Sequence, residues 1–69
     1  MIQRQIGNNI KRLRVEKKIS QEKLAELSDL DRTYIQSIEK GERNISVEVL
    51  LKLSVALRVE VTEILKDLI

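Results

Sequence analysis

A short segment near the middle of the chain carries polar side chains of a particular kind on one face. If residues 32–40 form an α-helix, at about 100° per residue, an arc of about 140° holds a guanidinium, an amide, two hydroxyls and an ammonium group. These groups belong to Arg32, Gln36, Lys40, Thr33 and Ser37. Ile35 and Ile38 fall on the opposite side and would face a core.

These side-chain types suit the edges of DNA bases and the phosphates beside them. Arginine pairs bidentately with guanine, glutamine pairs with adenine, and a threonine methyl can touch the methyl of thymine in the major groove. No acidic residue interrupts this outer face. An ordinary amphipathic helix with a solvated polar side has the same pattern, so the face alone leaves both interpretations open.

Two short helices are expected to position this face. Ser20 is a helix-capping residue with Glu22 in the first turn after it, and Leu24 and Leu27 form the apolar side of that helix. Residues 28–30 form a short break. A second helix then begins after the capping residue Asp31, runs to about Lys40 and ends at Gly41, where a left-handed backbone is usual.

The join between these two helices meets the demands of a helix-turn-helix. About three residues connect them, and the small side chain of Ala25 allows the helices to approach closely. Asp29 stands in the turn, where a left-handed conformation is often needed and aspartate tolerates it better than most residues. The spacing therefore predicts a helix-turn-helix formed by the second and third helices of the chain.

The remaining capping and helix-ending residues predict three more helices and no strand. They cover about 2–17, about 47–57 after the capping residue Ser46, and about 61–68 after the poorer cap Glu60. The chain of 69 residues contains no proline and only two glycines, which suits a fold made only of helices. We therefore expect one all-α, five-helix domain spanning residues 1–69.

The composition excludes several classes of protein. The chain has no cysteine and no histidine, which removes disulfides, zinc–thiolate sites, thiol catalysis and the commonest general base. Carboxylate pairs such as Glu22 and Glu26 form no site by themselves. We expect no enzyme, no metal, no cofactor and, for a domain of this size, no small-molecule ligand. The single aromatic residue argues against stacking of single-stranded nucleic acid.

The charged residues are distributed unevenly, although the net charge is only +2. Residues 1–18 carry six basic side chains and one acidic one, whereas residues 19–69 carry more acidic than basic side chains. A basic segment suits a polyanion, and a solvated helix face explains it equally well. No signal peptide or long apolar run is present, so we expect a cytoplasmic protein with no membrane partner.

The motifs together resemble the Cro/repressor type of helix-turn-helix regulator, whose domain is the lambda-repressor-like one. The resemblance runs from residue 6 to residue 65 and rests on Ser20-Gln21-Glu22-Lys23-Leu24-Ala25, Arg32-Thr33-Tyr34-Ile35-Gln36-Ser37-Ile38-Glu39-Lys40-Gly41 and Arg43-Asn44-Ile45-Ser46. Within this family, the Arg-Thr-Tyr-Ile and Arg-Asn-Ile-Ser segments most resemble those of the controller proteins of restriction-modification systems.

The resemblance implies a role for each matching position. Base reading would fall to Arg32, Thr33, Gln36 and Ser37. Contacts to phosphates or the groove edge would fall to Gln21, Tyr34, Lys40, Arg43 and Asn44. Arg14 and Glu39 would form an internal ion pair, which removes Arg14 from the DNA-facing charge. Tyr34 could instead cover the core near Leu30, and Arg43 could be a solvated loop charge.

The sequence departs from the family pattern in three places. Glycine is usual where Asp29 stands, a small hydroxyl residue is usual where Glu60 stands, and no extended basic arm is present. We therefore expect slight strain or an aspartate cap at the turn, and the start of the last helix stays open. Minor-groove contact by a tail is not expected.

The C-terminal third holds more apolar side chains than a small core can bury. Fifteen of the 25 residues from 45 to 69 are apolar, and an exposed apolar patch usually marks an interface. In the family that the chain resembles, the C-terminal helices commonly meet across a two-fold axis. We expect a homodimer with Ile64, Leu65 and Leu68 at its interface, although the monomer core or another chain could also take up this surface.

The function expected from these observations is sequence-specific regulation of transcription. A homodimer would bind double-stranded DNA at a palindromic operator, as a repressor or an activator of restriction-modification genes. Phage, developmental or antitoxin-type repressors share the same sequence motifs and remain alternatives. A protein-interaction module that has lost DNA binding is the rival from another class, but acidic or apolar residues on the outer face would be its sign, and none is present.

Overall fold

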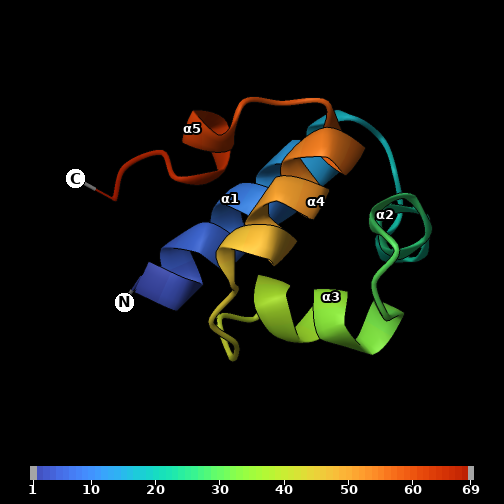
Figure 1. The fold of residues 1–69 in the computed structure, drawn as a ribbon, viewed down its shortest axis with the longest axis horizontal. Helices are drawn as coiled ribbons and strands as arrows, with labels where there is room; N and C mark the ends of the chain where they lie inside the picture. The colour runs from blue at the N-terminus through green and yellow to red at the C-terminus, as the bar shows by residue number, and fades with distance from the viewer. Residues whose placement is uncertain (1, 69) are drawn as a thin grey trace.

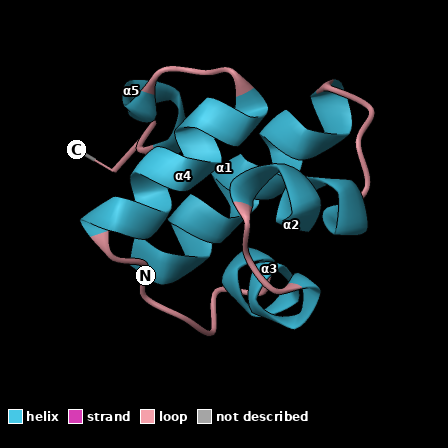
Figure 2. Ribbon diagram, turned by 45° about the vertical axis from the view of Figure 1, so that its right-hand side comes forward, coloured by secondary structure: helices cyan, strands magenta, loops and turns pink. Residues whose placement is uncertain are grey.

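Five helices follow one another along the chain in a computed structural model that describes residues 2–68. They are α1 (Ile2–Glu16), α2 (Gln21–Ser28), α3 (Arg32–Glu39), α4 (Val47–Leu57) and α5 (Val61–Ile64). Short turns join them, and no strand is found between residues 2 and 68 (Figure 2). The five predicted helices and the all-α class are confirmed.

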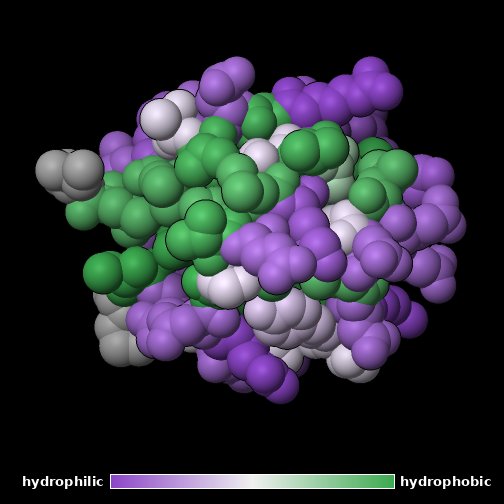
Figure 3. Space-filling view, in the orientation of Figure 1, coloured by the Kyte–Doolittle hydropathy of each residue, from purple (hydrophilic) through white to green (hydrophobic). Residues whose placement is uncertain are grey.

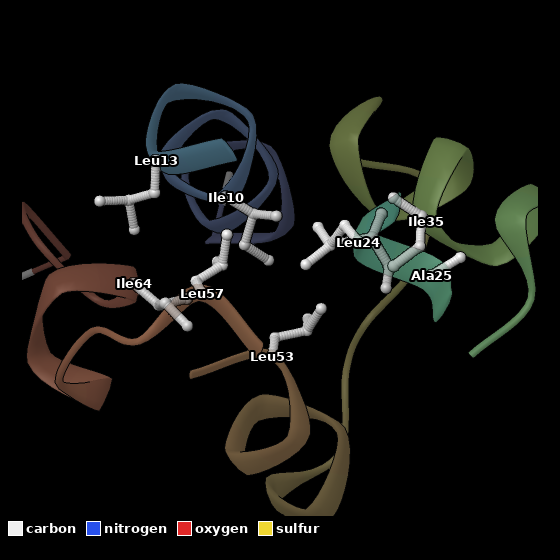
Figure 4. Close-up of a cluster of buried hydrophobic side chains, with 9 residues drawn as sticks. Ile10, Leu13, Leu24, Ala25, Ile35, Leu53, Leu57 and Ile64 are labelled. Carbon is white, nitrogen blue, oxygen red and sulfur yellow. The ribbon is translucent and has the colours of Figure 1, made fainter. Parts of the chain in front are cut away.

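The helices wrap around one core, with α3 along the lower edge of the molecule and α4 above it (Figure 1). α2 packs against both α3 and α4, whereas α1 packs against α3 and α5. Each of the five helices contributes at least one fully buried aliphatic side chain. These side chains are Ile10, Leu24, Ile35, Ile38, Leu53, Leu57 and Ile64. They converge in the centre of the domain (Figure 4), where burial of apolar surface stabilises the fold.

Serine caps set the start of two helices as predicted. The Ser20 hydroxyl accepts a hydrogen bond of 2.9 Å from the Lys23 backbone N–H, and Ser46 accepts one of 3.1 Å from Val49. Each bond satisfies one of the backbone donors that a helix leaves free at its start. Asp31, at the start of α3, forms no side-chain capping bond within residues 2–68.

The expected length of the last helix is wrong. It was expected to cover 61–68, but α5 ends at Ile64, and Asp67 adopts a left-handed backbone with φ of 67°. The buried amide of Asn9 explains this early end. Its Nδ2 donates to the Ile64 carbonyl at 2.9 Å and to the Lys66 carbonyl at 2.8 Å. A side chain of α1 therefore binds the Ile64 carbonyl, which a helix reaching residue 68 would use for the backbone N–H of Leu68.

Candidate nucleic-acid interface

The turn between α2 and α3 has the predicted left-handed residue. Asp29 has φ of 57° and ψ of 43° and follows the last residue of α2. The next backbone amide, that of Leu30, donates to the Ala25 carbonyl at 2.9 Å and closes the end of the helix. Asp29, which stands where glycine is usual in the family, adopts this left-handed conformation, and aspartate tolerates it better than most residues.

The two faces of α3 differ in chemistry as the sequence predicted. Ile35 and Ile38 are completely or almost completely buried, while Arg32 and Thr33 are exposed. Gln36 and Ser37 are half-buried on the same outer side, and Lys40 is exposed at the end of the helix. The Ser37 hydroxyl donates to the Thr33 carbonyl at 3.1 Å, which leaves its oxygen as an acceptor for an outside donor.

Tyr34 and Arg43 form one unit at the end of this face. The Tyr34 ring is half-buried and packs against the core, and the Arg43 guanidinium lies 5.6 Å from its centroid. This is within the range of a cation–π contact. Both interpretations of Tyr34 therefore have a structural basis, because the ring covers the core while it also supports an exposed cation. Asn44 is exposed in the same loop, which lies between α3 and α4.

Tyr34 and Arg43 also line a hollow beside the start of α3. It has a volume of about 460 Å³ and is lined by Asp31, Thr33, Tyr34, Ser37 and Arg43. Four of these side chains carry hydrogen-bond donors, and Asp31 contributes a carboxylate. The hollow therefore offers both hydrogen-bond donors and a cation to a ligand that approaches α3.

The predicted ion pair between Arg14 and Glu39 is present. Arg14 Nε donates to Glu39 Oε2 at 2.6 Å and Arg14 Nη2 donates to Oε1 at 3.0 Å, which is the bidentate geometry of a strong pair. The pair joins α1 to α3 on the core side, so Arg14 is not part of the outer charge.

Gln21 has a partner that the sequence analysis missed. Its Nε2 donates to Glu39 Oε1 at 3.0 Å, so the amide at the start of α2 is tied to the end of α3. The two residues are 18 positions apart, and no local pattern in the sequence indicates their contact. Gln21 is half-buried and also lines a hollow of about 290 Å³ together with Ser20, Glu22 and Arg32.

One residue expected at the dimer interface lies elsewhere. Ile64 is fully buried in the core of the monomer, because its side chain packs among those of α1 and α4 (Figure 4). Its assignment to the interface is therefore wrong. Leu65 and Leu68 are half-buried and remain near the surface.

The most exposed apolar surface lies on α4 and the end of α2. Val47, Leu51 and Val55, spaced four residues apart, are 72%, 50% and 76% exposed, and Leu27 beside them is 48% exposed. They line a groove of about 620 Å³ between the two helices. Apolar side chains also cover the neighbouring surface of α4 toward the C-terminal segment (Figure 3). The four-residue spacing on α4 was visible in the sequence, but the side of α4 that faces the core was not.

Other kinds of site find no support in the described part of the chain. No three acidic, histidine or cysteine side chains come together there as a metal site. None of the described helices is long and apolar enough to cross a membrane.

The comparisons with known proteins agree with this geometry. The family model described as Helix-turn-helix matches residues 10–64. The chain is 48% identical over 63 residues to the control protein C.MunI of a Mycoplasma species, covering 90% of this chain and 85% of that protein. It is 45% identical over 60 residues to the control protein C.BamHI of Bacillus amyloliquefaciens, covering 86% of this chain and 74% of that protein. The crystal structure of the restriction-modification controller protein C.AhdI from Aeromonas hydrophila superposes with a TM-score of 0.88 at 44% identity, covering 90% of this chain and 94% of that one.

Proposed function

This chain belongs to the Cro/repressor-type helix-turn-helix family of DNA-binding transcription regulators, and we propose that it controls the genes of a restriction-modification system. The observation that carries the proposal is the polar outer face of α3, held in a helix-turn-helix by a fold shared with restriction-modification controller proteins. The proposed role is DNA binding, and the proposal assigns the chain no reaction and no cofactor. In this proposal the protein acts in the cytoplasm, on the genes that it regulates.

The outer face of α3 reads the DNA sequence in this proposal. Arg32 pairs with guanine, Gln36 pairs with adenine, and Thr33 and Ser37 contact bases between them. Phosphates and the groove edge are contacted by a second set of residues, which fixes the position of α3 along the duplex. This set consists of Gln21, Tyr34, Lys40, Arg43 and Asn44. All of these side chains are exposed or half-buried, so DNA can reach them without a rearrangement of the fold.

The protein acts as a homodimer on a palindromic operator. A two-fold axis places two copies of α3 roughly 34–36 Å apart, one helical turn of DNA. We assign the dimer face to Leu65 and Leu68 and the adjoining apolar surface of α4. The support is the apolar surface that one monomer leaves uncovered there (Figure 3).

The function is tested by selecting bound duplexes from a random DNA pool. We expect enrichment of a two-fold symmetric motif with half-sites about one turn apart, and loss of this motif for Arg32→Ala. Lys11→Ala, a change of an exposed cation on α1, is the matched control and should retain the motif. Binding to all duplexes alike, without a motif, would contradict sequence-specific regulation. An enriched site that lies beside no restriction or methylation gene in the source genome would favour another kind of repressor.

The dimer face is tested separately by sedimentation of two variants. Leu68→Lys should give monomers, because it buries a charge in the proposed interface. Leu51→Lys places the same charge in the groove between α2 and α4 and should leave the dimer intact. The reverse result would move the dimer face to that groove, and a wild-type protein that sediments as a monomer at all concentrations would contradict the homodimer.

A further inference from the structure

One buried carboxylate holds donors from two different helices. Glu39 has a side chain that is 3% exposed, and it accepts from Arg14 of α1 through both oxygens and from Gln21 of α2 through Oε1. Arg14 Nη1 also donates to the Ile19 carbonyl at 2.9 Å, so the guanidinium is fixed beyond the ion pair as well. Glu39 is therefore a rigid acceptor at the place where α1, α2 and α3 meet.

The Arg14–Glu39 pair does not need Gln21 for its own geometry. The planar guanidinium already engages both carboxylate oxygens, at 2.6 and 3.0 Å. The bond from Gln21 is an addition to a pair whose charges are already matched. The bond mainly restricts Gln21, because its amide is more flexible than the paired side chains of Arg14 and Glu39.

The bond determines which end of the Gln21 amide faces inward. An ionised carboxylate only accepts hydrogen bonds, so Nε2 and not Oε1 must lie against Glu39. Nε2 carries two hydrogens, and one of them remains for a second acceptor. Gln21 also lines the hollow of about 290 Å³ that it shares with Ser20, Glu22 and Arg32. An acceptor seated there has a second donor and a cation nearby, beside the Glu22 carboxylate.

We propose that Glu39 is a positioning residue for DNA binding, which orients the Gln21 amide so that its free N–H donates to a DNA phosphate. This inference rests on the proposed function, in which Gln21 contacts the DNA backbone. Folding already restricts the rotamers of Gln21. DNA binding therefore does not have to reduce the conformational entropy of this side chain again. The ion pair thus serves DNA affinity in addition to the packing of α1 against α3.

The first test measures the Gln21 amide in the wild-type protein by nitrogen-15 NMR, with Gln21→Ala to assign its signals. We expect one amide proton of Gln21 to be shifted downfield and the group to be as ordered as the backbone. Gln36 is the matched control, since no hydrogen bond of its side chain is found among the described residues. Gln21 signals with the shifts and mobility of Gln36 would overturn the proposal, whether or not DNA binds.

The second test is a double-mutant cycle on operator affinity. Glu39→Gln should weaken binding about three- to tenfold in the wild-type background, the range of one hydrogen bond. It should cause no further loss in the Gln21→Ala background, because the amide that Glu39 positions is then absent. A merely structural Glu39 would give the same loss in both backgrounds, and that result would overturn the proposal. Each variant is compared at a temperature where its thermal melt shows a folded protein.

The two failures are distinguishable by the same data. If wild-type protein shows no preference for any duplex, the proposed function fails. If the wild type binds an operator and Arg32→Ala weakens it while Gln21→Ala does not, the function stands and the positioning role of Glu39 fails.

Discussion

α3 and α4 are built alike on the inside and differently on the outside. α3 buries Ile35 and Ile38, and α4 buries Leu53 and Leu57, so each contributes a pair of aliphatic side chains to one core (Figure 4). Outward, α3 presents mainly polar side chains, whereas α4 presents Val47, Leu51 and Val55 beside the Glu48–Lys52 ion pair. The inner faces are explained by folding alone. The outer faces are not, and their difference indicates two kinds of partner.

Hydration is favourable for the polar outer face of α3 and unfavourable for the apolar side chains on the outer face of α4. Polar groups on α3 keep their hydration until a polyanion replaces it, so the free protein has no penalty there. The exposed groove on α4 leaves apolar area in contact with water, at about 25 cal/mol for each Å². A surface with that cost is usually covered by another protein surface, but this groove lies outside the dimer face proposed at Leu65 and Leu68, so the cost remains in the proposed dimer.

Gly7→Ala should have the largest effect, because it attacks the packing that holds α3 in place. A Cβ at Gly7 would lie 2.2 Å from the backbone carbonyl oxygen of Ile38, so α1 and α3 would have to separate. We expect the free energy of unfolding to fall by about 1–3 kcal/mol or more, as for other overpacked sites. Urea denaturation measures it. Asn8→Ala, at the exposed neighbouring position, is the control and should leave the midpoint nearly unchanged. An unchanged midpoint for Gly7→Ala would mean that α1 does not hold α3.

The sequence predicted those features of α2, α3 and α4 that depend on residues close together in the chain. The serine caps, the left-handed Asp29 and the amphipathic pattern of α3 each depend on residues within one turn of helix, so local rules suffice. The Arg14–Glu39 pair spans 25 residues and was expected only because the motifs resemble a known family.

Contacts between distant segments could not be predicted in the same way. Asn9 ends α5 from 55 residues away, and no local signal at Ile64 marks that end. The bond from Gln21 to Glu39 depends on how α2 and α3 cross, which spacing does not specify. The assignment of Ile64 to a dimer face failed for the same reason, since an apolar pattern does not say which partner covers it.

Arg32→Ala should test the outer face of α3 without touching its inner face. We expect a loss of about 1–3 kcal/mol at the selected operator and a relaxed preference at one base pair, since arginine pairs with guanine through two hydrogen bonds. Unfolding should be unchanged because the side chain is exposed. Fluorescence anisotropy with operator and random duplexes measures the effect. Lys40→Ala should instead weaken both duplexes alike and lower the salt slope by about 1. Equal losses on both duplexes for Arg32→Ala would remove its base-reading role.

The starts of the two helices offer a finer comparison. Ser46 caps α4 through a hydrogen bond of 3.1 Å to Val49, whereas the Asp31 side chain makes no such bond to α3. Ser46→Ala should therefore cost about 1 kcal/mol of unfolding free energy. Asp31→Ala should cost less, because only its interaction with the helix dipole is lost. Thermal melts of both variants at the same protein concentration decide between them. A larger loss for Asp31→Ala would show that α3 depends on its cap as much as α4 does.

Val55→Thr should have the smallest effect on the stability of the monomer. Threonine has nearly the shape of valine and exchanges a methyl for a hydroxyl at a position that is 76% exposed. If the outer face of α4 contributes nothing to folding, the change should stay within about 0.5 kcal/mol at concentrations where the protein is monomeric. Thermal melts across a dilution series measure this. A loss that grows with protein concentration would mean that another copy covers this position, because assembly then contributes to the measured stability. A loss of 1 kcal/mol or more in the monomer would instead assign Val55 to the fold and remove the distinction between the outer faces of α3 and α4.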